Sequence, residues 1–144
     1  MANVRKERQD AIRMLVRGEC IRTQSELVSY LREHGFDVTQ ATISRDIADL
    51  GLEKDTKGIY VLPEDYRLRS IAASSVRETR RAQNQVLLLC DPGTASSVAA
   101  ALDASQTQGV LGSIAGDDTI LVICADDVQG ERFQNDVNKL LEKK

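Results

Sequence analysis

The sequence predicts an α+β chain made of two small domains, and three observations support this class. Apolar residues recur at helical spacing through the first 50 residues, whereas residues 82–144 contain three short, strongly apolar runs that are typical of strands. The total of 144 residues allows one mid-sized domain or two of about 70 residues each. A segment rich in Ser and Arg separates the two patterns. We therefore expect one domain over residues 1–66 and another over 82–144, with residues 67–81 forming a linker and a possible first strand near Val76.

The composition excludes several classes of protein. The chain is 42% hydrophobic and 28% charged, with 9 Gly and 2 Pro, which excludes a disordered tail and a collagen-like fibre. No apolar run approaches the ~18 residues that cross a bilayer, and the basic start is not followed by the apolar stretch of a signal peptide. We expect a cytoplasmic protein with no membrane partner.

The cysteines give no sign of a disulfide framework or a metal site. Cys20, Cys90 and Cys124 are odd in number and lack the Cys-x-x-Cys spacing, and the single His34 is not near any of them in sequence. Buried free thiols in a reducing compartment are the better interpretation, and we expect no metal.

Charge is distributed unevenly along the chain. The formal net charge of −3 argues by itself against nucleic acid as a partner. Residues 1–66 are however −2, residues 67–81 are +4 and residues 82–144 are −5. Most of the acidity therefore belongs to the second domain, so the total charge does not decide what the first domain binds.

Two helices are predicted at the start of the first domain. The first runs from Arg5 to Val16 and is stopped by Gly18. The second begins at a capping box, in which Thr23 is followed three residues later by Glu26, and it ends at Gly35, a residue suited to the left-handed position after a helix.

A third helix is predicted over residues 40–50, with Thr39 as its N-cap and Gly51 as its end. Two helices joined by a short turn that contains Gly form a helix-turn-helix pattern, which is also common in proteins that never contact DNA. A β-hairpin is predicted next, over residues 52–62, with Lys54 and Lys57 at its tip. Three helices closed by a basic-tipped hairpin make a winged helix-turn-helix domain. The residues expected to face inward from the third helix are Ala41, Ile43, Ile47 and Leu50.

The outward face of this third helix carries side chains suited to DNA. Gln matches the edge of adenine, Arg matches guanine or a phosphate, and Ser and Thr are short enough to let a helix lie deep in the major groove. The alternative is a solvated polar face, but Thr and Ser are poorer helix formers than the residues expected of an idle surface. The residues expected on this face are Gln40, Thr42, Ser44, Arg45 and Asp49.

The second domain is predicted to be a small α/β sandwich in the order β-α-β-β-α. Strands are expected over residues 85–90, 110–115 and 120–125. Helices are expected over residues 94–105 and 129–141.

Adjacent carboxylates are the main chemical feature of this second domain. Asp117 and Asp118 fall in the predicted turn between two strands, where they could hold Mg²⁺, act as acid and base, or bind a cation, and where a solvated turn is the simple alternative. With Asp103 as a third carboxylate, they would suit a guanidinium or ammonium group. Catalysis is the weakest of these interpretations because no His, Lys or Cys lies near the pair in sequence, and we expect no enzyme.

Two segments resemble the bacterial arginine repressor family. Residues 40–46, with Gly35-Phe36 before them and residues 60–63 after them, are similar to the family's N-terminal winged domain. Residues 92–95, 101–103 and above all 109–120, which contain Gly-Asp-Asp-Thr, are similar to its C-terminal domain. The similarity covers nearly the whole chain in the right order.

The resemblance implies a DNA-binding transcription regulator of arginine biosynthesis and catabolism genes. L-arginine would act as corepressor at the trimer–trimer interface of a hexamer, a homo-oligomer built as a dimer of trimers. The implied contacts to operator DNA are Gln40, Thr42, Ser44 and Arg45, with support from Lys54 and Lys57. The implied arginine site comprises Asp103, Asp117 and Asp118 with the loop residues Thr94, Ala95 and Ser96. Ser96 stands where we expect Gln or Asn in the family, so an amide contact to the ligand would be missing.

Two other functions stay open from the sequence. One is a metal-dependent enzyme that uses Asp117 and Asp118. The other is a ligand-sensing assembly protein that binds another cationic amino acid or has a role other than repression.

Overall fold

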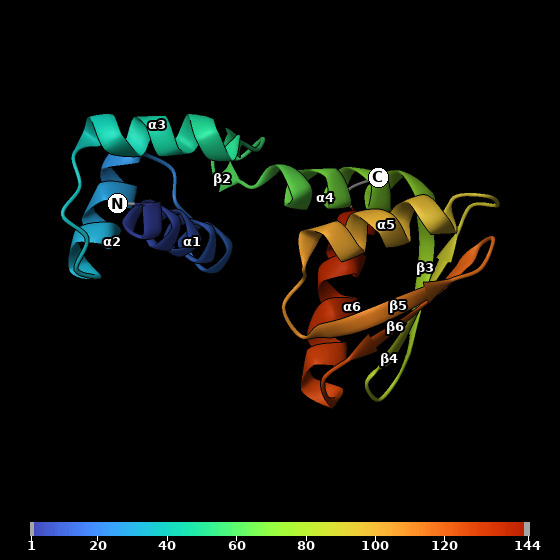
Figure 1. Cartoon of the computed structure of the whole chain (residues 1–144). Helices are drawn as coiled ribbons and strands as arrows, with labels where there is room; N and C mark the ends of the chain where they lie inside the picture. Colours follow the sequence, from blue (N-terminus) through green and yellow to red (C-terminus); the bar gives the residue numbers. More distant parts are fainter. Residues whose placement is uncertain (1, 143–144) are drawn as a thin grey trace. The chain divides into compact units, whose positions relative to one another are not determined.

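The computed structural model describes residues 2–142, and the chain divides into two compact units, residues 1–66 and 67–144 (Figure 1). Each unit has its own cluster of buried apolar side chains. None of the helices in the described part of the chain is long and apolar enough to span a membrane.

The N-terminal unit consists of three helices and a short hairpin. Helix α1 spans Ala2–Gly18, α2 spans Gln24–Glu33 and α3 spans Gln40–Leu50. The predicted helices are confirmed, and α1 is longer at both ends than the apolar pattern indicated. The core of the unit is formed by aliphatic side chains from all three helices, including Ile12, Leu27, Leu31 and Ile43.

The ends of these helices follow the signals in the sequence. The Thr23 hydroxyl accepts a hydrogen bond from the Glu26 N–H at 3.1 Å, and the Thr39 hydroxyl accepts one from the Thr42 N–H at 3.3 Å. The Glu26 carboxylate accepts the N–H of Arg22, one residue before the expected partner in a capping box. The φ angle of Gly51 is +68°, so α3 ends in the left-handed conformation that favours glycine.

A two-stranded hairpin closes the unit, as predicted. Strands β1 (Glu53–Lys54) and β2 (Tyr60–Val61) are antiparallel. Their turn is held by the Asp55 carboxylate, which accepts the N–H groups of Lys57 at 2.8 Å and Ile59 at 3.0 Å. The Tyr60 N–H donates to the Ile21 carbonyl at 2.8 Å, which ties the hairpin to the segment between α1 and α2.

The prediction of a linker over residues 67–81 is wrong for its first part, because residues Pro63–Ser75 form helix α4. Proline is well tolerated in the first turn of a helix, and Glu64 and Asp65 follow it, where carboxylates favour the helix dipole. Ala72 is buried and Leu68 packs against the core of the second unit, so the small residues that suggested a linker are packing residues.

The C-terminal unit contains a four-stranded antiparallel sheet in the order β3-β4-β6-β5. The possible strand near Val76 is confirmed as β3, which pairs with β4. The strands are β3 (Val76–Ala82), β4 (Gln85–Cys90), β5 (Val110–Ala115) and β6 (Thr119–Cys124), and the helices are α5 (Ala95–Ser105) and α6 (Asp127–Leu141).

One face of this sheet is buried under helices. Burial alternates along β4 and β6, so that Val86 and Val122 join Val98 of α5 and Phe133 of α6 in one apolar cluster. Alternate residues of the same strands, such as Leu87, are only half-buried. The opposite face of the sheet is therefore apolar but partly open within this single chain.

The expectation of three buried thiols is wrong for one of them. Cys90 and Cys124 are buried, and burial in the core raises the pKa of both thiols. Cys20 is exposed in the segment between α1 and α2, because the neighbouring Ile21 takes the core position there.

Gly130 of α6 provides a test of how tightly the helix packs on the sheet. A Cβ atom at Gly130 would lie 2.6 Å from the Gln83 carbonyl oxygen in the β3–β4 turn, so we expect Gly130→Ala to destabilise the unit by about 1 to 3 kcal/mol in urea unfolding. The clash outweighs the gain of about 1 kcal/mol in helix propensity. Gly18→Ala is the matched control, because no atom lies within 4 Å of its added Cβ. Equal changes in the free energy of unfolding for the two substitutions would contradict the close packing of α6 on the sheet.

Candidate DNA-binding surface and ligand site

Helix α3 presents most of the predicted polar face to solvent. Gln40, Ser44, Arg45 and Asp49 are exposed, and Thr42 is half-buried, with its hydroxyl 3.1 Å from the Thr39 hydroxyl. The inward face differs from the prediction at two positions. Ala41 is exposed, and Asp46 is buried. Ile43 is fully buried, whereas Ile47 and Leu50 are half-buried.

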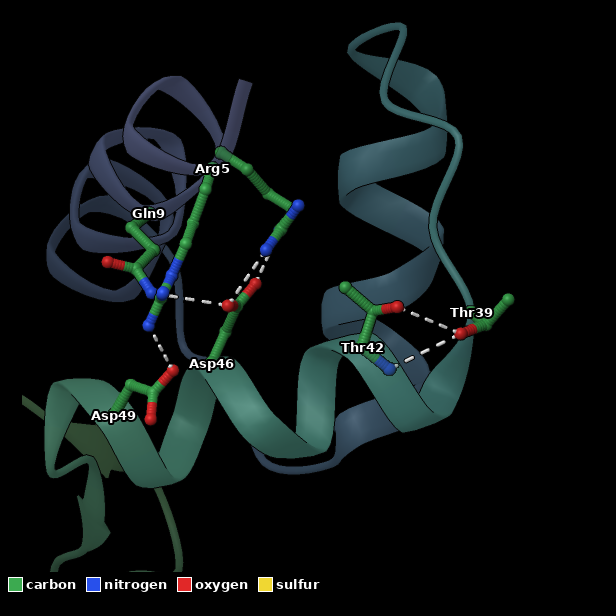
Figure 2. A network of polar contacts seen from close by, with 7 residues as sticks. Arg5, Gln9, Thr39, Thr42, Asp46 and Asp49 are labelled. Atoms are coloured by element: carbon green, nitrogen blue, oxygen red, sulfur yellow. Dashed lines mark hydrogen bonds and ion pairs between the residues drawn. The ribbon is translucent and has the colours of Figure 1, made fainter. Parts of the chain in front are cut away.

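Asp46 is held by two side chains of α1. Arg8 donates from Nε to Oδ2 at 2.5 Å and from Nη2 to Oδ1 at 3.0 Å, and Gln9 donates from Nε2 to Oδ1 at 3.2 Å (Figure 2). Asp46 is 1% exposed. Burial acts to raise the pKa of Asp46, but the hydrogen bonds from Arg8 and Gln9 and the charges of Arg8 and Arg5 outweigh it, so the pKa lies below its ordinary value. This bidentate pair joins α1 to α3 through their buried faces.

Sequence reasoning missed this pair although both helices carried a signal for it. Arg8 precedes Ile12 and Val16 at intervals of four residues, which places it on the buried face of α1. Asp46 lies three residues after Ile43 on α3, again on the inward side. A search for apolar residues alone excludes such positions, whereas opposite charges on two inward faces indicate a buried ion pair.

A second ion pair joins the same helices at the surface. Arg5 Nη2 lies 2.7 Å from Asp49 Oδ2, and the two side chains are 60% and 45% exposed. Arg45, by contrast, makes no hydrogen bond or ion pair with any residue in the described part of the chain. A pocket of about 220 Å³ lies between α1 and α3. It is lined by Arg5, Arg8, Thr42, Arg45, Asp46 and Asp49.

The hairpin carries the two predicted lysines on its exposed side. The Lys54 ammonium lies 5.2 Å from the centre of the Tyr60 ring, a cation–π contact that orients it. Lys57 is exposed in the turn, and its carbonyl accepts a 2.6 Å hydrogen bond from the Arg22 side chain. The turn is thus fixed by Asp55 and Arg22 rather than by its lysine side chains.

In the C-terminal unit, the acidic turn lies against the loop that precedes α5. Asp117 accepts the Gly93 N–H on its carboxylate and the Ala95 N–H on its carbonyl, both at 3.3 Å. The Asp118 carbonyl accepts the Cys90 N–H at 2.7 Å, and its Oδ1 accepts the Thr119 hydroxyl at 3.2 Å. Both carboxylates are exposed. The structure therefore brings the predicted loop and the predicted turn together.

Asp103, one of the other predicted ligand residues, lies far from the acidic turn within the chain. Asp103 is exposed near the end of α5 and accepts the Ser113 hydroxyl at 3.3 Å. It lies eight residues after Ala95, which is about 12 Å along a helix. Asp103 and the acidic turn are thus at opposite ends of α5. Thr94 donates its hydroxyl to the Asp91 carbonyl at 2.7 Å, and Ser96 is exposed.

Ala95 has no free polar atom to offer at this site. Its methyl group is fully buried, and its N–H already donates to Asp117. Within the described residues, no three acidic, His or Cys side chains gather as metal ligands.

Two family models together match most of the chain. A model described as "Arginine repressor, DNA binding domain" matches residues 4–68, and one described as "Arginine repressor, C-terminal domain" matches residues 72–139. A curated protein from Solibacter usitatus named "Arginine repressor" is 44% identical over 94% of this chain and 95% of its own length. The chain belongs to the arginine repressor family.

Other relatives in this family have the same name. The protein from Carboxydothermus hydrogenoformans is 44% identical over 83% of this chain and 87% of its own. The protein from Thermus thermophilus is 39% identical over 94% of this chain and 89% of its own. Membership in a family of DNA-binding repressors makes the chain a regulator rather than an enzyme, so the metal-dependent enzyme is no longer a competing interpretation.

Proposed function

We propose that the chain is an arginine-responsive repressor of arginine biosynthesis and catabolism genes, with L-arginine as its corepressor. The observation that carries the proposal is the exposed polar face of α3, where Arg45 has no partner in the described residues, on a unit matched by a DNA-binding domain model. Such a regulator works in the cytoplasm, where the operator DNA is, and uses no metal.

The DNA contacts are proposed for α3 and the hairpin. Arg45 can form two hydrogen bonds to guanine or bind a phosphate, and Gln40 can pair with adenine. Thr42 and Ser44 are short, so the helix can lie close to the bases. Lys54 and Lys57 supply wing contacts to the DNA backbone.

L-arginine is proposed to bind at the acidic turn. Asp117 and Asp118 are exposed and keep unused acceptor sites, which suit the forked donors of a guanidinium. The loop residues Thr94, Ala95 and Ser96 form the adjoining wall, with Ala95 contributing shape rather than a polar atom. Asp103 completes the acidic set.

Asp103 is proposed to reach the ligand from another copy of the chain. Within one chain it lies about two turns of α5 from the loop that touches Asp117. The C-terminal unit also leaves Leu111 and Ile114 of β5 each 72% exposed, beside the half-open face of the sheet. Exposed aliphatic residues of this kind favour a homo-oligomer, which we propose is a trimer that pairs into a hexamer.

The proposed mechanism is thermodynamic linkage. Arginine neutralises carboxylates that would otherwise face one another between trimers, so ligand binding and hexamer formation stabilise each other. The hexamer then holds several winged units against neighbouring operator sites, which multiplies affinity without changing any single contact.

Gel retardation of a labelled fragment from the gene's own upstream region tests this function. We expect arginine to increase retention by the full chain, and Arg45→Ala to weaken it by about 1 to 3 kcal/mol per contact while leaving the oligomer size unchanged. Arg13→Ala is the matched control, because Arg13 is an exposed arginine of α1 whose partner, Asp10, lies on the same helix. Retention that is unaffected by Arg45→Ala would exclude α3 as the reading helix.

The same assay distinguishes the repressor from a second candidate function. A ligand-sensing assembly protein for another cationic amino acid would change oligomer size with lysine or ornithine and would retain no upstream fragment. Retention that requires arginine favours the repressor.

A further inference from the structure

We propose that Arg5 of α1 is a DNA-binding residue, which binds a backbone phosphate at the pocket beside Arg45. This inference rests on the proposed role of α3 as the reading helix. It adds a DNA contact from helix α1 to the contacts proposed for α3 and the hairpin.

The first argument is the position of Arg5. The pocket of about 220 Å³ is lined from one side by Arg5 and Arg8 of α1 and from the other by Thr42 and Arg45 of α3. Two of these residues, Thr42 and Arg45, belong to the face proposed to read DNA. Figure 2 shows Arg5 extending from α1 toward Asp49 on α3. A phosphate that flanks the bases read by α3 would therefore come within reach of Arg5.

The second argument is the charge of the pocket. Arg8 and Asp46 neutralise each other in a bidentate, nearly buried pair, so neither charge is available to a ligand. The groups that remain are Arg5, Arg45 and Asp49, with a net charge of +1. The N-terminal unit as a whole has net charge −2, so this pocket is a local exception to an acidic unit. A phosphate is the anion that the proposed partner offers there.

The third argument is the weakness of the bond that Arg5 would give up. Its pair with Asp49 is one 2.7 Å contact between side chains that are 60% and 45% exposed. Exposed pairs contribute about 0 to 1 kcal/mol, so the guanidinium can exchange Asp49 for a phosphate at small cost. In the free protein, the same pair masks an aspartate on the reading helix that would repel the DNA backbone.

The alternative is that Arg5 and Asp49 only tie α1 to α3. The two hypotheses predict opposite changes in DNA affinity for Asp49→Asn. If the pair is a tie, Arg5→Ala and Asp49→Asn both weaken DNA binding through a less ordered α3. If Arg5 binds phosphate, Arg5→Ala weakens binding, whereas Asp49→Asn frees Arg5, removes a repelling charge and strengthens binding.

The experiment measures Kd for operator DNA and for unrelated DNA with the full chain and arginine, over a range of salt concentrations. We expect Arg5→Ala to weaken binding to both DNAs by about threefold to tenfold, and to reduce the slope of log Kd against log salt by about 1 for each winged unit engaged. Arg5→Lys should restore the slope, because it retains the charge. Asp49→Asn should tighten binding about twofold or more.

Arg13→Ala and Asp10→Asn form the control pair, because they break an exposed ion pair that lies wholly on α1. These variants should leave Kd and the salt slope unchanged. An unchanged slope in Arg5→Ala, or weaker binding in Asp49→Asn, would overturn the inference. If Arg45→Ala also leaves operator binding intact, the proposed role of α3 fails with it. If Arg45→Ala weakens operator binding as expected while Arg5→Ala leaves the salt slope unchanged, only the role of Arg5 fails.

Discussion

Arg8→Ala is expected to destabilise the N-terminal unit by about 3 to 5 kcal/mol, because it leaves the Asp46 carboxylate buried without its cation. The side chains of Asp46 and Arg8 are only 2% and 15% exposed, so water cannot replace the lost partner without opening the contact between α1 and α3. Hydrogen exchange of the full chain measures this loss as faster exchange of the α3 amides. The amides of α5 and α6 provide an internal reference, because they belong to the other unit.

The control for this prediction removes both charges together. Arg8→Met combined with Asp46→Leu replaces the pair by apolar side chains, and such replacements are often neutral or stabilising. We expect the double variant to recover most of the protection of α3. A loss below about 1 kcal/mol in Arg8→Ala alone would mean that the pair behaves as an exposed one.

The same pair gives a pH dependence with a defined sign. The pKa of Asp46 in the folded protein lies below its ordinary value, because hydrogen bonds and nearby arginine charges outweigh the effect of burial. The ionised Asp46 carboxylate therefore stabilises the folded unit fully above its pKa in the unfolded chain, which is about 4. This stabilisation is lost as the pH falls through the pKa of Asp46 in the folded protein. The difference between the wild type and Arg8→Ala should consequently be smaller in acid than at pH 7.

Local signals in the sequence predicted most of the N-terminal unit. Thr23 and Thr39 cap α2 and α3, and Gly51 takes the left-handed conformation that ends α3. These contacts join residues three to five positions apart, so the short segment contains all the information needed. The hairpin follows for the same reason, because Asp55 organises its turn within four residues.

Contacts between distant residues were the ones missed. Arg8 and Asp46 are 38 positions apart, and the apolar spacing along either helix does not show that these two charged side chains meet. The small residues Ala and Ser predict a linker over residues 67–81 because they have little side-chain surface, yet Ala72 of α4 is buried in a core supplied by later strands. Small residues indicate a linker or a close contact equally well until the opposing surface is known.

The acidic turn shows the same division between local and distant information. The turn around Asp117 and its approach to the loop before α5 follow from the order of strands and helix. Asp103 lies at the far end of α5, and the role that we propose for it depends on contacts between chains, which a single sequence does not contain. In the proposed assembly, the turn of one chain would supply Asp117 and Asp118, and another chain would supply Asp103.

Asp118→Asn is expected to weaken L-arginine binding by about 2 to 5 kcal/mol in calorimetry, because it removes one partner of the charge pair that we propose to be enclosed between trimers. The substitution is conservative for the chain itself. Asn keeps an oxygen that can accept the Thr119 hydroxyl, and the backbone bond from Cys90 to the residue 118 carbonyl is unaffected. Asp136→Asn is the matched control: it makes the same change of charge on exposed α6, at a residue without a hydrogen bond or ion pair in the described part of the chain.

Measuring oligomer size distinguishes a loss of arginine binding from a loss of hexamer formation. If carboxylates repel one another between trimers in the absence of arginine, Asp118→Asn reduces that repulsion, so the variant should form hexamers without arginine at least as readily as the wild type. Added arginine should then increase its hexamer fraction less than it does in the wild type, and in Asp136→Asn. Calorimetric affinity equal to that of the wild type would exclude Asp118 from the site. Weaker assembly without ligand would instead mean that Asp118 stabilises the interface directly, and the proposed linkage through charge neutralisation would be wrong.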